Sequence, residues 1–186
     1  MIIPYHFPVT IETYTVRRRK NDFPTFDCCP FCRAMNTLLR HGYYERNAIE
    51  EETCHRITIC RLKCPDCGKT FSILPNFLLP YFQHTLAFMI RILLALWQWG
   101  VQLCTRQLRR FYKMRLDGKL TEIELFFRKI AHLEAFPQKR SEKALAFLQM
   151  IQAMERAIFT RKWWQHAITS LLSHSLYRGS QVVFTQ

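Results

Sequence analysis

The sequence predicts an α+β protein in which a small N-terminal β ribbon is followed by an all-α domain containing a helix-turn-helix. Two observations support this fold class. Pairs of cysteines with C-x2-C spacing, at 29–32 and 64–67, enclose a stretch whose apolar residues alternate as in strands. From about Gln83 onward, apolar residues recur instead at the spacing of a helix. A chain of 186 residues has room for one small domain and one helical domain.

Residues 1–27 are expected to lead into the ribbon. Within them, Ile11–Val16 alternates apolar and polar residues, which predicts a short strand. The basic run Arg17–Lys20 follows, and it fits a contact with phosphates as well as it fits a solvated loop.

Residues 28–80 form the predicted ribbon, and Pro75 and Pro80 are expected to end its sheet. Its candidate strands are Gly42–Arg46, His55–Lys63 and Lys69–Leu74. Adjacent glutamates at 50–52 occupy the expected hairpin turn between the first two of these strands.

Residues 81–186 form the predicted helical domain. Its first part, about 83–133, has the size of a helix-turn-helix unit, and Thr121 is the expected N-cap of its third helix. The helices of this unit are predicted at 83–99, 103–112 and 120–133, with turns at Trp99–Gly100 and Asp117–Gly118. Further helices are predicted within 141–175, at 141–158 and 161–175. The alternative is a plain helical bundle with one basic side.

The two cysteine pairs predict a zinc site. Each pair has a proline after its first cysteine, and such a turn aims two thiolates at one point. Two turns together supply the four soft, tetrahedral ligands that Zn²⁺ prefers. The candidate metal ligands are Cys29, Cys32, Cys64 and Cys67. A site closed by four cysteines is structural rather than catalytic, so we expect one zinc ion that contributes to folding.

The remaining cysteines offer weaker alternatives. Cys28 in place of Cys29 would change the spacing to C-x3-C. Cys54 and Cys60 flank a predicted strand, and whether they form a second partial site with His55 is left open by the sequence. Cys104 fits a small core residue.

A cluster of basic residues lies in the predicted helix-turn-helix. The formal net charge of the chain is +13, and its positive excess peaks between positions 106 and 119. The candidate nucleic-acid-binding residues are Arg106, Arg109, Arg110, Lys113, Arg115 and Lys119. The first four follow i, i+3, i+4, i+7 spacing and should share one helix face, with Leu103, Leu108 and Phe111 turned into the bundle. The cluster favours double-stranded DNA as a partner; the alternative is a solubilising face.

The sequence does not predict an enzyme. Only 14 acidic residues are present, and no trio of carboxylates suited to two-metal chemistry stands out among them. P-loop, G-x-S-x-G and H-E-x-x-H motifs are absent from the sequence.

The sequence does not predict a membrane protein either. The apolar stretch 86–104 is interrupted by Arg91 and Gln98 and lacks the roughly 20 apolar residues of a span. Because the first residues do not resemble a signal peptide and four cysteines have metal-ligand spacing, we expect a protein of the reducing cytoplasm.

The run from Ile59 to Ser72, Ile-Cys-Arg-Leu-Lys-Cys-Pro-Asp-Cys-Gly-Lys-Thr-Phe-Ser, together with Cys-Pro-Phe-Cys at 29–32, resembles the N-terminal zinc ribbon of bacterial insertion-sequence transposases. It is also similar to small bacterial zinc-ribbon proteins linked to mobile elements. The resemblance covers residues 28 to about 81, and 82–133 only loosely. In the transposases, a ribbon and a helix-turn-helix precede a catalytic domain, whereas this chain continues in predicted helices.

The expected function is therefore zinc-dependent DNA binding, as an accessory or regulatory factor of a mobile genetic element. The alternative is an adaptor that docks a transposase or nuclease through the ribbon and through aromatic residues such as Trp97, Trp99, Trp163 and Trp164. A truncated or non-autonomous transposase is the third hypothesis. The sequence does not define the oligomeric state, the DNA target or the helix that enters the groove.

Overall fold

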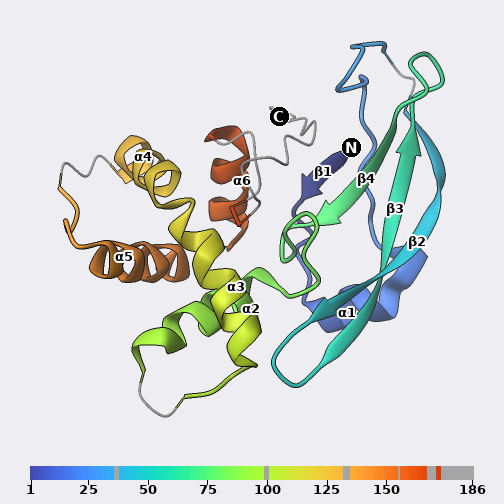
Figure 1. The fold of residues 1–186 in the computed structure, drawn as a ribbon. Helices are drawn as coiled ribbons and strands as arrows, with labels where there is room; N and C mark the ends of the chain where they lie inside the picture. The colour runs from blue at the N-terminus through green and yellow to red at the C-terminus, as the bar shows by residue number, and fades with distance from the viewer. Residues whose placement is uncertain (36–37, 99–100, 132–134, 155, 167–170, 173–186) are drawn as a thin grey trace.

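The α+β fold class is confirmed by a computed structural model of the chain (Figure 1). The structure describes residues 1–35, 38–98, 101–131, 135–154, 156–166 and 171–172. Strands occupy the N-terminal part of the chain, and the C-terminal part is helical. Within the described ranges, no helix combines the length and the apolar character needed to cross a membrane.

The sheet has four strands in the spatial order β1-β4-β3-β2. Their bounds are β1 (Ile2–Tyr5), β2 (Leu39–Ile49), β3 (Cys54–Lys63) and β4 (Thr70–Pro75). Antiparallel pairing joins β2 to β3 and β3 to β4, whereas β1 pairs parallel with β4. The three predicted strands are confirmed. The pairing of Ile49 with Cys54 also places the three glutamates in the hairpin turn.

The predicted strand at Ile11–Val16 is wrong: these residues belong to helix α1 (Ile11–Arg17). Thr10 caps this helix, because its Oγ1 accepts a hydrogen bond from the backbone N–H of Thr13 at 3.3 Å. Tyr14 is fully buried and donates its hydroxyl to the carbonyl of Thr58 at 2.9 Å, which holds α1 against β3. Residues 1–27 are thus part of the sheet layer, through β1 and α1, rather than a separate lead-in.

After the sheet, the described chain forms helices α2 to α6 and the segments that connect them. Their bounds are α2 (Leu86–Leu94), α3 (Arg106–Asp117), α4 (Leu120–Ala131), α5 (Arg140–Ala153) and α6 (Arg156–His166). A single 3-10 turn, Ala95–Trp97, extends α2. The expected turn at Trp99–Gly100 lies outside the described residues, as do the end of the helix predicted to reach 133 and most of the segment 167–175.

Side-chain caps explain where α2 and α3 begin. Thr85 Oγ1 accepts from the N–H of Phe88 at 3.2 Å, and Thr105 Oγ1 accepts from the N–H of Leu108 at 3.3 Å. The helix predicted at 103–112 therefore starts at Arg106 and continues to Asp117. The predicted N-cap at Thr121 is wrong, because α4 already begins at Leu120, directly after the short Gly118–Lys119 connection.

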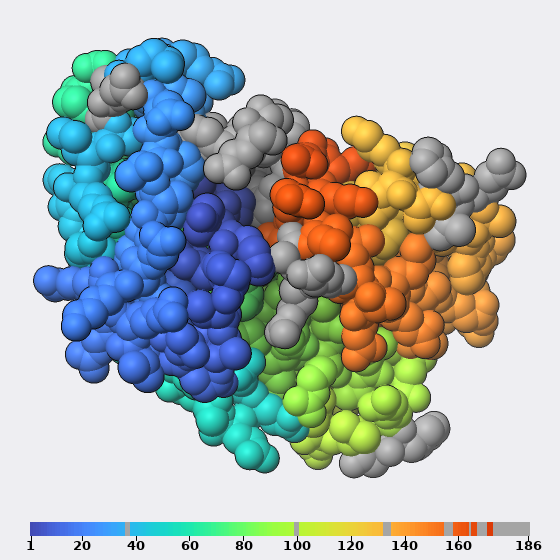
Figure 2. All heavy atoms as spheres, turned by 180° about the vertical axis from the view of Figure 1, so that it is seen from behind, coloured from blue at the N-terminus to red at the C-terminus, as the bar shows by residue number. Residues whose placement is uncertain are grey.

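Two hydrophobic cores divide the chain between Leu78 and Leu79. One core lies in the sheet half and includes Tyr14, Ile57 and Phe71. The other lies among the helices and includes Phe126 and Trp163. In the space-filling view from behind, the two halves stand side by side (Figure 2). The division falls close to the end expected for the ribbon, at residue 80.

The β2–β3 hairpin connects the two halves. The Arg46 guanidinium donates to the carbonyls of Leu79 and Phe82, the latter at 2.6 Å. The backbone of Ile49 bonds to Gln83 and Thr85 at 2.8 and 3.0 Å. Ion pairing of Glu51 with Arg91 at 2.5 Å then ties the hairpin turn to α2. These contacts fix where the helical half begins relative to the sheet.

Candidate metal centre and basic helix

The two C-x2-C turns have matching backbone geometry. In the first, the N–H of Arg33 donates to the carbonyl of Cys29 at 2.9 Å; in the second, the N–H of Gly68 donates to that of Cys64 at 2.9 Å. Both Arg33 and Gly68 are left-handed, with φ of 64° and 69°. Glycine adopts this conformation at no steric cost, whereas Arg33 is strained there. Each turn directs its two thiols to the same place.

The four predicted ligands, Cys29, Cys32, Cys64 and Cys67, converge. Their sulfur atoms all lie within 4.8 Å of one another, and the pairs Cys29–Cys67 and Cys32–Cys64 are each 3.7 Å apart. A tetrahedron with Zn–S bonds of about 2.3 Å has an edge of about 3.8 Å. The spacing of the sulfurs therefore fits a single tetrahedral metal ion.

The thiols of this cluster affect one another's protonation. Burial raises the pKa of the Cys67 thiol, and neighbouring thiols such as Cys64 add to the effect. Thiolates crowded together repel, and a divalent cation at their centre would favour the deprotonated form that serves as ligand. The arrangement is compatible with a structural metal site.

The alternative ligand sets are not assembled in the described structure. Cys28 lies outside the sulfur cluster. Cys54 and Cys60 stand six positions apart on the extended strand β3, so they are separated by roughly 20 Å and cannot share one ion. Cys104 packs, partly buried, against the helical core, as expected for a small core residue.

The six basic candidates differ in how exposed they are. Arg106, Arg110 and Lys113 are exposed and Arg109 is half-buried, so four of the six candidates remain near solvent on this helix. Lys113 pairs with Asp117 at 2.7 Å, one turn further on. In the described part of the chain, the arginines at 106, 109 and 110 form no ion pair with a carboxylate. The opposite side of α3 buries Tyr112 and Leu116 in the helical core.

The other two basic candidates do not belong to the exposed face. Lys119 is only 6% exposed and its ammonium group pairs with Glu122, so it lies away from the exposed face of α3. Arg115 stacks on Phe111, with its guanidinium carbon 4.5 Å from the ring centroid, and donates to the carbonyl of Leu172 at 3.2 Å. Phe111 was expected to point into the bundle but is 41% exposed beneath that guanidinium.

The tryptophans are not arranged as a docking surface in the described structure. Trp163 is 1% exposed within the helical core, and Trp97 packs against that core. The side chain of Trp164 and residue Trp99 lie outside the described part. Exposed apolar side chains lie instead beside the cysteine cluster, at Phe31 and Met35.

Sequence reasoning missed a second group of ligand-type side chains. Glu12, Glu50 and His55 offer ligand atoms that all lie within 4.8 Å of one another. The sequence did not reveal this group because Glu12 is distant in sequence from Glu50 and His55, and because α1 was expected to be a strand. Only the tertiary packing of α1 beside the hairpin brings them together.

Comparison with known proteins gives one match. A family model described as a domain of unknown function (DUF6431) matches residues 29–109. The match begins at Cys29, the first of the four clustered cysteines, crosses the boundary between the two cores and ends within α3. Searches of curated proteins and of solved structures gave no match. The unit described by the family is therefore larger than the ribbon alone.

Proposed function

We propose that the protein is a zinc-dependent DNA-binding protein that acts as an accessory or regulatory factor of a mobile genetic element. The observation that carries the proposal is the exposed basic face of α3, defined here as Arg106, Arg109, Arg110 and Lys113. It lies on a helix whose other side is anchored by Tyr112 and Leu116.

Charge on this face favours a polyanion. Like-charged side chains at i,i+4 positions repel by a few tenths of a kcal/mol per pair, and a phosphate backbone relieves that repulsion. Arginine also matches phosphate geometry with two donors. Neutralising four phosphates releases their counterions, which makes binding strongly dependent on salt.

In this proposal, the cysteine centre holds a structural zinc ion. Its role is to stabilise a ribbon whose hairpin is bonded to the segment entering α2. Loss of the ion would thus weaken the platform on which α2, α3 and α4 act as a helix-turn-helix unit. The link to mobile elements rests on the resemblance of residues 28–81 to the transposase ribbon.

A protein-docking role is the second candidate, and one observation favours it. Phe31, Met35 and Leu39 are more than half exposed near the cysteine centre. In this alternative the ribbon, rather than α3, contacts a transposase or another mobile-element protein.

The test is DNA binding measured by fluorescence anisotropy over a range of salt concentrations. For four neutralised phosphates, we expect log K to fall against log salt with a slope of roughly −3.6. Replacing Arg109 and Arg110 together with alanine should make the slope shallower by about two and weaken binding to all sequences alike.

The matched control removes the same charge elsewhere. Lys129 and Arg161 are exposed residues of α4 and α6, and their double replacement by alanine should leave the slope nearly unchanged. Equal losses in both double variants would indicate that net charge, not α3, attracts DNA. Unaltered binding by the Arg109/Arg110 variant contradicts the proposal and favours the docking role.

A further inference from the structure

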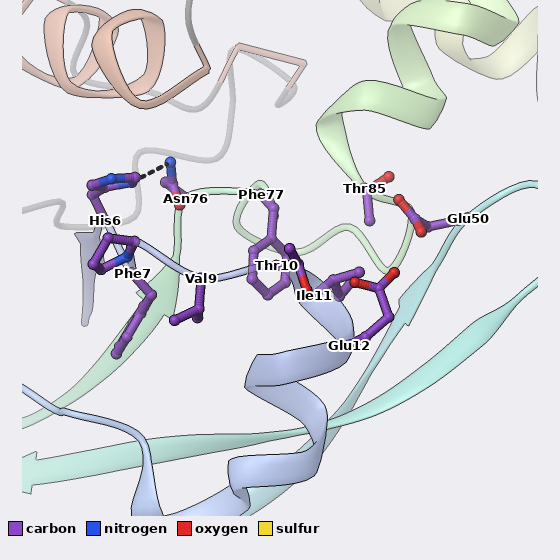
Figure 3. Close-up of a pocket in the computed structure, with 11 residues that line it drawn as sticks. His6, Phe7, Val9, Thr10, Ile11, Glu12, Glu50, Asn76, Phe77 and Thr85 are labelled. Atoms are coloured by element: carbon purple, nitrogen blue, oxygen red, sulfur yellow. Dashed lines mark hydrogen bonds between the residues drawn. The ribbon is translucent and has the colours of Figure 1, made fainter.

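Three ligand-type side chains from different elements meet beside a cavity. Glu12 lies in the first turn of α1, Glu50 directly follows β2, and His55 lies in β3. One carboxylate oxygen of each glutamate and one imidazole nitrogen of the histidine lie within 4.8 Å of one another. In Figure 3 the carboxylates of Glu12 and Glu50 point toward one another from facing elements. Glu50 and His55 flank one hairpin turn, and the packing of α1 beside that hairpin adds Glu12.

The negative charge of the two carboxylates in this group favours a bound cation. The chain has 27 lysines and arginines for 14 acids, yet neither Glu12 nor Glu50 forms an ion pair with a lysine or arginine of the described part. Two carboxylates held this close repel each other. The imidazole of His55 is the group that faces them, with its Nε2 3.7 Å from Glu50 Oε2.

That 3.7 Å separation is too long for a hydrogen bond, which spans about 2.7–3.2 Å. It is close to the separation of two ligands on one ion, because a tetrahedron with metal–ligand bonds of about 2.1 Å has an edge of about 3.4 Å. A small rotation of the Glu50 or His55 side chain would bring the two atoms to the separation of about 3.4 Å expected for two ligands of one ion.

The backbone around the group is held in place. The N–H of Glu50 donates to the carbonyl of Thr53 at 2.8 Å, which closes the hairpin turn. Thr53 Oγ1 lies 3.1 Å from His55 Nε2, and this hydrogen bond competes with a metal for the same nitrogen. The hydroxyl is uncharged and exposed, so a divalent cation that also contacts two carboxylates is the stronger partner.

From this geometry, we propose that Glu12, Glu50 and His55 bind a second divalent metal ion, distinct from the one at the cysteine centre. One imidazole nitrogen and two carboxylate oxygens suit Zn²⁺ or Mn²⁺, whereas Mg²⁺ and Ca²⁺ prefer oxygen ligands alone. Three protein ligands leave at least one coordination position open. The proposal does not depend on DNA binding.

Beside this group lies a cavity of about 520 Å³ (Figure 3). Glu12 and Glu50 line it together with polar groups that include His6, Thr10 and Asn76. Asn76 Nδ2 and His6 Nδ1 are 3.2 Å apart on the far side, so the cavity has polar groups at both ends. Water or a small oxygen-donor ligand could complete the coordination from this side.

The test exploits the different chemistry of the two sites. Mn²⁺ prefers carboxylate ligands over thiolates, so the zinc-loaded full chain titrated with Mn²⁺ and followed by electron paramagnetic resonance reports only the proposed site. We expect about one Mn²⁺ bound per chain, and loss of that ion in Glu50→Gln and in His55→Ala. Added Zn²⁺ should displace the Mn²⁺ from the wild-type protein.

The control is Glu52→Gln, an exposed glutamate of the same turn that lies outside the group. It should retain Mn²⁺ binding, and every variant should keep the zinc of its cysteine centre, which shows that the ribbon is folded. The separate variant Glu12→Gln tests the ligand from α1. Absence of Mn²⁺ binding by the wild-type protein, or binding unchanged in Glu50→Gln and His55→Ala, would overturn the proposal.

Discussion

Individual residues of the cysteine centre differ in how far the sequence reveals their roles. The pairing of the four cysteines in two turns could be predicted because C-x2-C spacing is local and needs no tertiary contact. Gly68 could also be understood from its place after the second pair, where the backbone is left-handed. Arg33 holds the matching position in the first pair, and nothing in its type announces a left-handed residue.

Replacement of one buried ligand should release the metal ion. Cys64 is fully buried, and serine at this position offers a poor ligand for Zn²⁺, so Cys64→Ser should lose about one equivalent of zinc and lower the melting temperature. Metal analysis and thermal denaturation measure the two effects. Cys60→Ser is the matched control, because Cys60 lies equally buried in β3, just before Cys64, but outside the sulfur cluster. Full zinc retention by Cys64→Ser would refute the assignment.

Among the elements, α1 shows why part of the fold was not predictable. Its seven residues cover less than two helical turns, so the apolar period of a helix is barely sampled, and its two threonines, isoleucine and valine favour a strand. The cap at Thr10 and the buried hydrogen bond from Tyr14 to β3 decide in favour of the helix. Tertiary contacts therefore override the local pattern.

Helix α3 shows the same limit of prediction from local sequence pattern, here for a candidate binding surface. Spacing alone predicts that Arg106 and Lys113 share a face, because both lie on the same helical stripe. It does not predict that Lys119 is buried or that Arg115 donates to the carbonyl of Leu172, since these depend on neighbouring elements. Local spacing gives the face, and packing decides which basic residues remain on it.

The junction between β2 and the segment before α2 depends on Arg46. Burial lowers the pKa of Arg46, and its charge is compensated by two carbonyls, those of Leu79 and Phe82. Arg46→Met leaves those carbonyls without this donor, so we expect a loss of about 1–3 kcal/mol in the free energy of unfolding, measured by urea denaturation.

A control for this variant lies in the same hairpin. Arg56 is exposed and donates to Asn47 at 3.3 Å, so Arg56→Met should change stability by less than about 0.5 kcal/mol. Equal stability of the Arg46 and Arg56 variants would show that the Arg46 hydrogen bonds do not stabilise the junction.

For the whole molecule, the distribution of carboxylates predicts that the chain alone neither cuts nor joins DNA. Two-metal chemistry needs ligands for two ions about 4 Å apart. In the described part, the one ligand group that contains carboxylates is Glu12, Glu50 and His55, which suffices for a single ion. Incubation with supercoiled plasmid and Mg²⁺ or Mn²⁺ should leave the plasmid intact. Reproducible nicking that disappears in Glu50→Gln would contradict this prediction.

The parallel pairing of β1 with β4 has a consequence for the order in which the molecule is made. The Met1 ammonium group donates to the carbonyl of Thr70 at 2.9 Å, across a sequence separation of 69 residues. During synthesis β1 emerges before β4 and must wait for it to pair, whereas Cys67 emerges just before β4. Capture of the proposed zinc ion could therefore precede pairing of β1 with β4, and until that pairing forms the edge of β4 is open to strands of other chains.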